Sequence, residues 1–306
     1  MRATVLVNAT SGTAVKALPD DLRQKLADHF SANGIVAELE MVEGDALIAA
    51  AQRAKTKAEN REIDTVIVGG GDGTISSVAA VLAGTKVPLG ILPLGTLNHF
   101  AKDAGIPLGL EDAIALIATA SPRAVDRAEA NGRIFVNNSS IGMYPHMVVD
   151  RERRRRRSHI NKWAATILSS FHMVRRFPLT KLRVRTEEGS EPCRTPCLFV
   201  GNNKYDLNLL SLGKRESLDA GELWLYISKH QTRLSLFWFT LRTLLGLADP
   251  ASDLRMLPVK HTEITAKKNR LFVTFDGEIE IMRPPLRYKT RPGALYVYAP
   301  PSREKP

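Results

Sequence analysis

The glycine run at residues 69–74, Gly-Gly-Gly-Asp-Gly-Thr, carries the strongest chemical signal in the sequence. Glycine has no Cβ, so the backbone N–H groups of such a run can approach a phosphate closely. A helix that begins in the run presents its positive N-terminal end to the same anion, and Asp72 can orient a donor or bind Mg²⁺. The run has neither the GxxxxGK(S/T) pattern of a Walker A loop nor the spacing of a dinucleotide fingerprint. Taken alone, it is also compatible with a tight turn that binds no ligand.

Two other segments offer polar groups that could act with the glycine run. Asn8, Ser11 and Gly12 belong to the loop NATSG, and Thr96 and Asn98 belong to the segment PLGTLNHFA. Thr96 offers a hydroxyl and Asn98 an amide at the expected start of a helix, where such residues also serve as ordinary caps.

A pair of carboxylates stands near the other end of the chain. The segment FDGE places Asp276 and Glu278 on either side of a glycine. Carboxylates in such a pair can accept a proton from a reacting hydroxyl. A bare DGE is also a common hairpin turn, so this segment alone decides nothing.

Alternating strands and helices must position these segments. We expect buried strands at residues 3–7, 35–41, 63–68 and 87–92, with helices at about 18–33, 46–58 and 111–119 and another directly after the glycine run. Such alternation predicts a mostly parallel sheet that helices cover on both faces. Ligands of these sheets bind at the carboxyl ends of the strands. The three loops of the first part are therefore expected to converge on one cleft.

The pattern changes after about residue 124. Short segments with alternating or apolar texture predict a β-rich second part. The candidate strands are RIFVNNSSIG, LRVRTEE, PCLFVGNN, GELWLYIS, EITAKK, LFVTFDGEIEI and ALYVYAP. Two helical stretches, at about 159–177 and 232–247, interrupt them. A chain of 306 residues of which 44% are hydrophobic is long enough for one large or two medium domains.

The order of four motifs, NxxSG, GGDGT, PxGTxN-x-FA and DGE, resembles the diacylglycerol kinase and sphingosine kinase family, and within it the bacterial soluble lipid kinases. The resemblance covers nearly the whole chain. It implies an α/β domain similar to NAD kinases and phosphofructokinases over residues 1–124, which a returning segment at about 294–306 completes. It also implies a β-rich, sandwich-like domain over residues 125–293, with the nucleotide in the cleft between the two.

The resemblance also implies roles for individual residues. The ATP-binding positions would be Asn8, Ser11, Gly12, Gly70, Gly71, Asp72, Gly73, Thr74, Ser77, Gly95, Thr96 and Asn98. Asp276 and Glu278 match the catalytic carboxylates of the family, and one of them would accept the proton of the substrate hydroxyl. Glu278 is slightly favoured, but the sequence does not separate the two.

The chain departs from the family at two positions. Many members carry a carboxylate where this chain has His99 and another where it has Ala220, and both belong to a structural Mg²⁺ network in relatives. Their joint loss suggests that this second metal site is absent or rebuilt, with Asp219 as a candidate ligand. A catalytic Mg²⁺ that arrives with ATP is still expected, with Asp72 at the phosphates.

The net charge of +11 and a pI of about 9.8 indicate a polyanionic partner. The densest basic run, Arg153–Arg157, precedes the first helical stretch, and basic patches beside Trp-bearing amphipathic helices suit an anionic membrane surface. A solvated loop, helices that pack on the sandwich and a homodimer interface remain alternatives. Nucleic acid is disfavoured because no recognition helix, RNP-like stretch or zinc module is present.

The expected location is the cytoplasm, with peripheral membrane contact. The start of the chain has too short an apolar run for a signal peptide, and no stretch reaches the roughly 18 apolar residues of a spanning helix. Cys193 and Cys197 are expected to be reduced structural thiols. We expect an ATP-dependent kinase that phosphorylates a lipid hydroxyl. The alternatives are a soluble small-molecule kinase of the NAD kinase type and a non-catalytic lipid or nucleotide binder.

Overall fold

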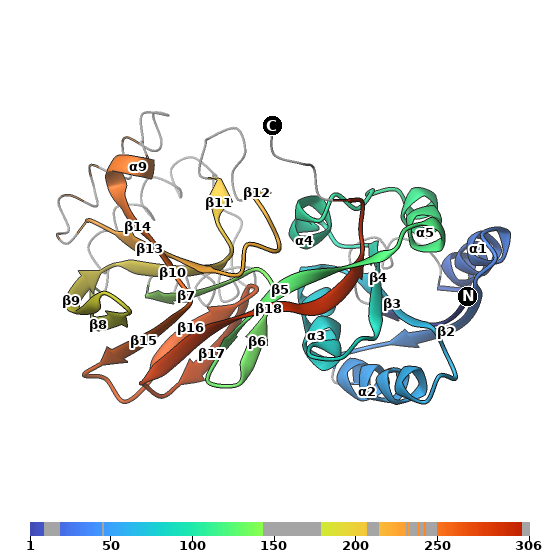
Figure 1. Cartoon of the computed structure of the whole chain (residues 1–306), viewed down its shortest axis with the longest axis horizontal. Coiled ribbons are helices and arrows are strands. Elements are labelled where there is room, and N and C mark those ends of the chain that lie inside the picture. The colour runs from blue at the N-terminus through green and yellow to red at the C-terminus, as the bar shows by residue number, and fades with distance from the viewer. Residues whose placement is uncertain are drawn as a thin grey trace, which may run out of the picture.

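The computed structural model of the chain describes residues 1–8, 19–44, 46–142, 179–206, 214–230 and 250–301, together with the single positions 232, 235, 238 and 242. Figure 1 shows two parts side by side, an α/β part that holds the N-terminus and a β-rich part. Ser11, Gly12 and Arg153–Arg157 lie outside the described residues, as do the stretch 159–177 and most of 232–247.

The α/β part is built on four parallel strands in the order β2 (Val36–Val42), β1 (Arg2–Asn8), β3 (Thr65–Gly70) and β4 (Pro88–Pro93). Every residue of β3 is buried, which is the mark of a strand covered on both faces. Its apolar side chains form one core with those of the flanking helices. The predicted mostly parallel sheet is confirmed.

Five helices connect or follow these strands: α1 (Pro19–Ala32), α2 (Ala46–Glu59), α3 (Asp72–Leu82), α4 (His99–Asp103) and α5 (Leu110–Thr119). In α1 the apolar residues Leu22, Leu26 and Phe30 recur every fourth position and are all buried. Helix α3 follows the end of β3 after the single residue Gly71, and helix α4 follows the end of β4 after the loop 94–98. Their N-terminal ends therefore lie at the carboxyl edge of the sheet, where the sequence predicts the site.

The β-rich part contains a separate antiparallel sheet and a second core. The sheet order is β14 (Leu254–Val259), β13 (Leu223–Ser228), β10 (Cys197–Asn202), β7 (Asn138–Gly142), β16 (Leu271–Phe275) and β17 (Glu278–Met282). A short ribbon joins β11 (Tyr205–Asp206) to β12 (Lys214–Arg215), and helix α9 (Pro250–Asp253) precedes β14. The segment FDGE forms the turn between β16 and β17, so the hairpin expected there is present.

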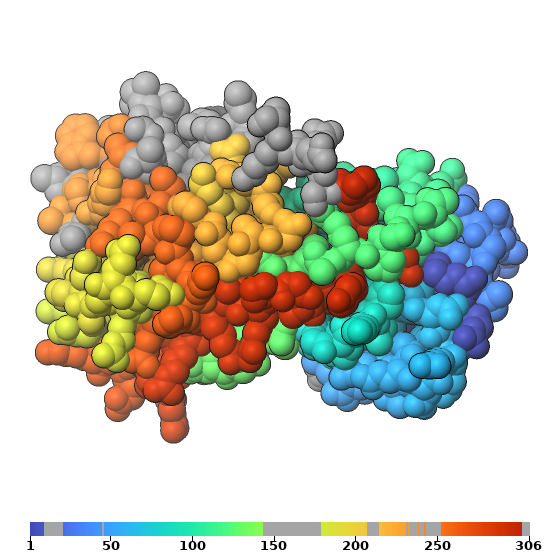
Figure 2. Space-filling view, in the orientation of Figure 1, coloured from blue at the N-terminus to red at the C-terminus, as the bar shows by residue number. Residues whose placement is uncertain are grey.

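Two long strands join the parts. β5 (Pro122–Ala130) and β18 (Leu286–Tyr298) pair with each other through most of their length, and Figure 2 shows their green and red atoms running from one part into the other. β18 pairs with the parallel strand β4 through Tyr296 and Val297. Its other end pairs with β15 (His261–Ala266), which continues the sheet through β8 (Thr180–Thr186) to β9 (Gly189–Thr195).

One mixed sheet therefore runs through both parts, which the sequence pattern does not predict. A last short strand, β6 (Arg133–Phe135), pairs with β5 beside helix α3. The division at residue 124 with a returning segment at 294–306 remains a prediction. No helix among the described residues has the length and apolar character needed to cross a bilayer.

Candidate active site

The loops that follow β3 and β4 touch each other through glycine backbones. A Cβ on Gly95 would collide with the Cα of Gly71, and a Cβ on Gly70 would lie 2.6 Å from the Cβ of Thr74. Real Cβ atoms do not approach other atoms so closely, so a larger residue at Gly95 would force the two loops apart, and one at Gly70 would displace Thr74 in the first turn of α3. Gly95 is therefore required for the contact between the loops, in addition to any role in ligand binding.

The N-terminal end of α3 is open to a ligand. Gly71 is the N-cap residue, and no side chain caps this end of the helix. The Asn8 amide, at the end of β1, donates a hydrogen bond of 2.8 Å to the Thr74 hydroxyl, and the Ser77 hydroxyl donates to the Gly73 carbonyl at 2.9 Å. An uncapped helix N-terminus with glycines around it can accept a phosphate group.

Asn98 shapes the loop after β4. Its backbone adopts the left-handed conformation with φ of 51°, and its side-chain amide donates to the carbonyls of Pro93 at 3.1 Å and Gly95 at 2.9 Å. Its Oδ1 atom is buried without a protein partner. Thr96, in contrast, is exposed and can reach a ligand. Asn98 thus stabilises the loop through its hydrogen bonds, while the Thr96 side chain is exposed on the same loop.

Asp72 joins the same two loops. Its Oδ1 atom accepts a hydrogen bond of 3.0 Å from the backbone amide of Phe100, at the beginning of α4. This bond caps one of the free N–H groups of α4 from the neighbouring loop. Asp72 is therefore a structural link between β3–α3 and β4–α4 as well as a candidate ligand at the phosphates.

Asp276 is held by four donors. Its Oδ2 atom accepts from the Ser76 hydroxyl of α3 and from the Val136 amide at 2.9 Å, and its Oδ1 atom accepts from the amides of Asn137 at 2.8 Å and Asn138 at 3.0 Å. Desolvation by burial raises the pKa of this carboxyl, although the four hydrogen bonds oppose the shift. Asp276 fastens the β16–β17 turn to α3 and to the start of β7.

Glu278 has a different environment from Asp276. Its side chain is 54% exposed, and its Oε1 atom would lie 3.4 Å from a Cβ placed on Gly73. Arg133 donates to Glu278 Oε2 at 3.1 Å and to Glu280 through Nε, and its guanidinium lies 5.9 Å from the centre of the Phe275 ring. Glu278 therefore stands beside the first turn of α3 with one oxygen held by Arg133 and the other directed toward Gly73.

Residues from both parts line one hollow of about 520 Å³. Its lining includes Gln52 and Lys55 of α2, Ser77 of α3, Arg133 of β6 and Glu278 of β17. The hollow thus brings a predicted ATP-binding residue and a predicted catalytic carboxylate together. The adjacency that the sequence predicts for the glycine run and the DGE turn is present.

A buried guanidinium stabilises the junction between the two parts. Arg215 and Asp103 form an ion pair of 2.8 Å in which both side chains are almost inaccessible. Arg215 also donates to the Val136 carbonyl at 2.6 Å and to Asn137 Oδ1 at 2.8 Å. The segment Val136–Asn138 is therefore fixed from two directions. Its backbone amides donate to Asp276, and two of its oxygens accept from Arg215.

The described residues contain no cluster of three or more His, Cys, Asp or Glu side chains that would hold a metal ion. Asp219 lies between β12 and β13, where its backbone amide donates to the Ser217 hydroxyl at 3.0 Å, and His99 is exposed. Mg²⁺ in kinases is commonly held by one or two carboxylates together with substrate phosphates and water. Asp72 fits such a site, whereas a cage made only of protein ligands does not fit. The assignment of Asp72 and Asp219 remains a prediction.

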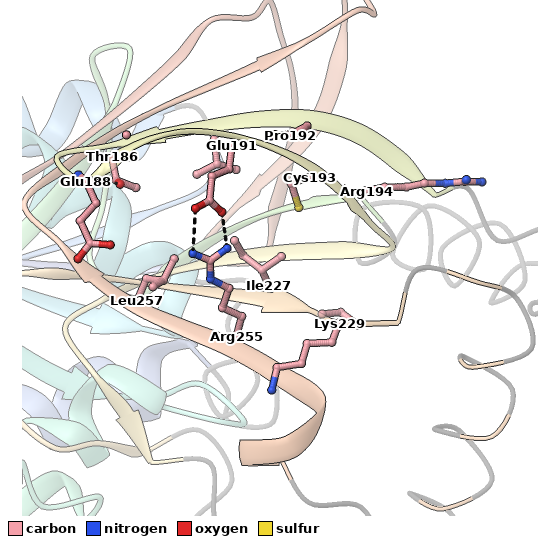
Figure 3. Close-up of a pocket in the computed structure, with 13 residues that line it drawn as sticks. Thr186, Glu188, Glu191, Pro192, Cys193, Arg194, Ile227, Lys229, Arg255 and Leu257 are labelled. Atoms are coloured by element: carbon pink, nitrogen blue, oxygen red, sulfur yellow. Dashed lines mark hydrogen bonds and ion pairs between the residues drawn. The ribbon is translucent and has the colours of Figure 1, made fainter.

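A second cavity, of about 130 Å³, lies away from these residues (Figure 3). It is bounded by β9, β13 and β14, and the ion pair between Glu191 and Arg255 closes one side. Burial raises the pKa of the Cys193 thiol that lines it. None of the predicted site residues lines this cavity.

A comparison with known families matches residues 2–130 to the diacylglycerol kinase catalytic domain. This segment contains the strands, helices and loops that form the α/β side of the hollow. Residues 2–130, which are less than half of the chain, are therefore similar to the diacylglycerol kinase catalytic domain. The family predicted from the four motifs is confirmed.

Curated relatives match part of the chain. A protein of Citrobacter koseri named "Probable lipid kinase YegS-like" is 46% identical over 96 residues, which are 30% of this chain and 32% of the relative. A protein of the same name from Pseudomonas syringae is 38% identical over 130 residues, which are 42% of this chain and 41% of the relative. The matches thus span less than half the length of these relatives.

Solved structures match the whole fold. A crystal structure of a diacylglycerol kinase from Bacillus anthracis covers 98% of this chain with a TM-score of 0.70 and 19% sequence identity. Another structure from the same organism gives a TM-score of 0.72 at 22% identity over 98% of both chains. This likeness shows that the α/β part and the β-rich part together form a known two-part fold.

Several residues of the site have no signal in the sequence. Arg133 stands in a short strand after a turn, and Ser76 lies inside a helix without motif character. The donors of Val136–Asn138 are backbone amides, which almost every residue type has, so the sequence does not mark them. Arg215 is one basic residue among many in a chain of net charge +11. Only contacts across the fold identify these groups.

Proposed function

We propose that this protein transfers a phosphoryl group from ATP to the hydroxyl of a lipid at a membrane surface. The observation that carries the proposal is the position of the Glu278 carboxylate beside Gly73, at the uncapped end of α3. The family of residues 2–130 and the names of the relatives support a kinase that acts on a lipid.

In this proposal the glycine loops bind and orient the triphosphate. The backbone N–H groups at the start of α3 face its charge, with Asn8 and Thr74 holding the neighbouring loop in place. Phosphoryl transfer needs little covalent help, so orientation and neutralisation of charge supply most of the rate. The predicted ATP-binding set, including Ser11 and Gly12 in the loop beyond β1, belongs to this proposal.

We assign the acceptance of the substrate hydroxyl proton to Glu278. Asp276 already accepts four hydrogen bonds, so its lone pairs are engaged in the junction. Glu278 is exposed to the hollow and has a single ionic partner, Arg133, among the described residues. Asp276 therefore acts in this proposal as a positioning residue that fixes the turn on which Glu278 stands.

Mg²⁺ would supply neutralisation of the phosphate charge when it arrives with ATP. Asp72 is the carboxylate proposed to meet it, through the oxygen that does not accept from Phe100. The proposal also retains two expectations for the location of the protein. It acts in the cytoplasm as a peripheral protein, and the basic run Arg153–Arg157 with the neighbouring apolar stretches contributes to membrane contact.

A panel of acceptors with labelled ATP tests the proposal. Purified protein with Mg²⁺ should label a lipid alcohol, such as diacylglycerol, a sphingoid base or a polyprenol, in mixed micelles. Labelling of NAD alone would assign a soluble small-molecule kinase instead. Nucleotide binding without transfer to any acceptor would assign a silent binder.

A further inference from the structure

The outer face of the mixed sheet in the β-rich part is strongly basic. Five strands lie side by side there in the order β9, β8, β15, β18 and β5. The side chains of Leu182, Ile264 and Leu286 point inward and are buried in the second core. Because side chains alternate along a strand, the neighbouring positions point outward.

The outward positions of these strands carry eight cationic side chains, which define the basic sheet face: Arg127, Lys181, Arg183, Arg185, Arg194, Arg287, Lys289 and Arg291. Two carboxylates, Glu129 and Glu263, lie among them. Six of the eight belong to exposed residues, whereas Lys289 and Arg127 are partly buried, and the Nε and Nη1 atoms of Arg127 are inaccessible to solvent. Figure 2 shows the yellow atoms of β8 and β9 and the red atoms of β18 on the same face of the molecule.

The two carboxylates neutralise only part of this charge. Glu263 pairs with Arg287 at 2.8 Å, and Glu129 pairs with Lys289 at 3.0 Å and with Arg291 at 3.2 Å. The other five cations form no ion pair with the residues that the structure describes. The basic sheet face therefore keeps a net positive charge that its own acids do not balance.

The strand register places like charges directly opposite each other. Arg127 faces Arg291 across β5 and β18, and Lys181 faces Arg194 across β8 and β9. Such cross-strand pairs of equal charge are destabilising. A sheet arranged only for stability would alternate the signs, so the arrangement indicates a partner of negative charge.

We propose that the basic sheet face docks on an anionic phospholipid bilayer. The proposal rests on the proposed function, because a lipid acceptor resides in such a bilayer. Anionic bilayers attract clustered Lys and Arg side chains at their surface. Single-stranded nucleic acid would require aromatic platforms for stacking. Apart from His261, whose ring contacts Glu187 at 3.1 Å, the uncharged outward positions offer Thr265, Ser190 and Pro192, so the chemistry favours a lipid surface.

Vesicle binding of the full chain tests the proposal. The variant Arg183→Gln/Arg185→Gln removes two exposed cations of the basic sheet face without altering the hollow. The matched control Arg23→Gln/Lys25→Gln removes two exposed cations from α1, at the far end of the molecule. Binding is measured by co-sedimentation with phosphatidylcholine–phosphatidylserine vesicles and with pure phosphatidylcholine vesicles.

Each cation close to an anionic surface contributes about fivefold to the partition coefficient. The Arg183→Gln/Arg185→Gln variant should therefore bind the mixed vesicles about 25-fold more weakly, while the control variant binds like the wild type. Equal binding by both variants would overturn the proposal. The face would instead be assigned to nucleic acid by two results together. The wild type would bind a duplex oligonucleotide and not vesicles, and the Arg183→Gln/Arg185→Gln variant would bind the oligonucleotide more weakly.

Two further readouts separate this inference from the proposed function. Phosphorylation of a short-chain acceptor without a bilayer should be the same for wild type and the Arg183→Gln/Arg185→Gln variant. Its absence in both proteins would refute the kinase and leave the vesicle result standing. Replacement of Arg153–Arg157 by Ser serves as the second comparison. If only this replacement weakens vesicle binding, the membrane contact lies there and the basic sheet face is refuted.

Discussion

The two ends of the DGE turn lie in regions of opposite character. Around Asp276, Ser76, three backbone amides and the nearby Arg215–Asp103 pair form a closed junction between the two parts. Around Glu278 the surface opens into the hollow, and Arg133 is the only ionic partner that the described residues supply. Two carboxylates that look equivalent in the sequence therefore have different environments, which supports the different roles that we propose for them. A carboxylate that accepts four hydrogen bonds is suited to fixing geometry, whereas an exposed one that Arg133 holds by a single oxygen can still accept a proton.

The largest expected effect is the loss of turnover when Glu278, the carboxylate that faces the hollow, is replaced. Glu278→Gln removes the proposed proton acceptor, so turnover should fall by about 10²–10⁴-fold, while the free energy of unfolding changes by less than about 0.5 kcal/mol. The matched control is Glu280→Gln, which removes the other carboxylate held by Arg133 and should leave turnover within a few fold. Steady-state kinetics and denaturant unfolding of both variants check this prediction. Equal losses in the two variants would remove Glu278 from the reaction.

Breaking the buried pair of the junction should affect stability rather than chemistry. Asp103→Asn leaves the Arg215 guanidinium buried without its counter-charge, so the free energy of unfolding should fall by about 3–5 kcal/mol. Arg53→Gln breaks an exposed ion pair with Glu40 and should cost less than about 1 kcal/mol. Chemical denaturation measures both. A small effect of Asp103→Asn would mean that the junction does not hold the two parts together.

Asp276→Asn sharpens the comparison within the turn itself. The amide that replaces the carboxylate loses one acceptor oxygen, so the buried N–H of Val136 loses its partner, whereas the Ser76 hydroxyl can accept from the new amide. Each unsatisfied group costs about 1–3 kcal/mol, and the unfolding midpoint should shift accordingly. ATP affinity, measured by calorimetry, should stay close to the wild-type value. Loss of turnover with unchanged stability would instead indicate that Asp276, and not Glu278, takes the proton.

The smallest effect is expected on the basic sheet face, through Glu129. Burial raises the pKa of this carboxyl, but hydrogen bonds from Lys289 and Arg291 outweigh burial, so its pKa lies below the ordinary value. A lowered pKa stabilises the folded state above the ordinary glutamate pKa of about 4.3. This contribution disappears as pH falls through the folded pKa. Glu129→Gln should therefore lower stability by about 1–2 kcal/mol at neutral pH and have no effect in strong acid. A pH-independent difference would contradict the assignment.

The fold was largely predictable because its pattern is local. Buried strands followed by amphipathic helices predict the α/β part, and four motifs in order indicate the family. The strand β5 was not predicted, since its sequence PRAVDRAEA lacks β-branched and aromatic residues apart from one valine. It becomes a strand because β18 supplies its hydrogen-bonding partner. The sequence also does not predict that one sheet continues through both parts, because this continuity depends on the same pairing of β5 with β18.

The site was predictable only in outline. The glycine run and the DGE turn were expected to meet, and they do so at Gly73 and Glu278. The difference between Asp276 and Glu278 depends on three amides of a strand start about 140 residues away in the chain. Arg133 likewise acquires its place through β6, far from the turn in sequence. The residue types near the turn do not indicate hydrogen-bond partners that lie so far away in the chain.

The central claim is that the first turn of α3 and the DGE turn form one nucleotide site. Hydrogen exchange of the full chain, with and without Mg²⁺ and a non-hydrolysable ATP analogue, tests this claim most directly. We expect the nucleotide to slow exchange in peptides that contain residues 71–77 and in those that contain residues 276–280. Protection confined to the first set, with the DGE turn exchanging as in the free protein, would contradict it.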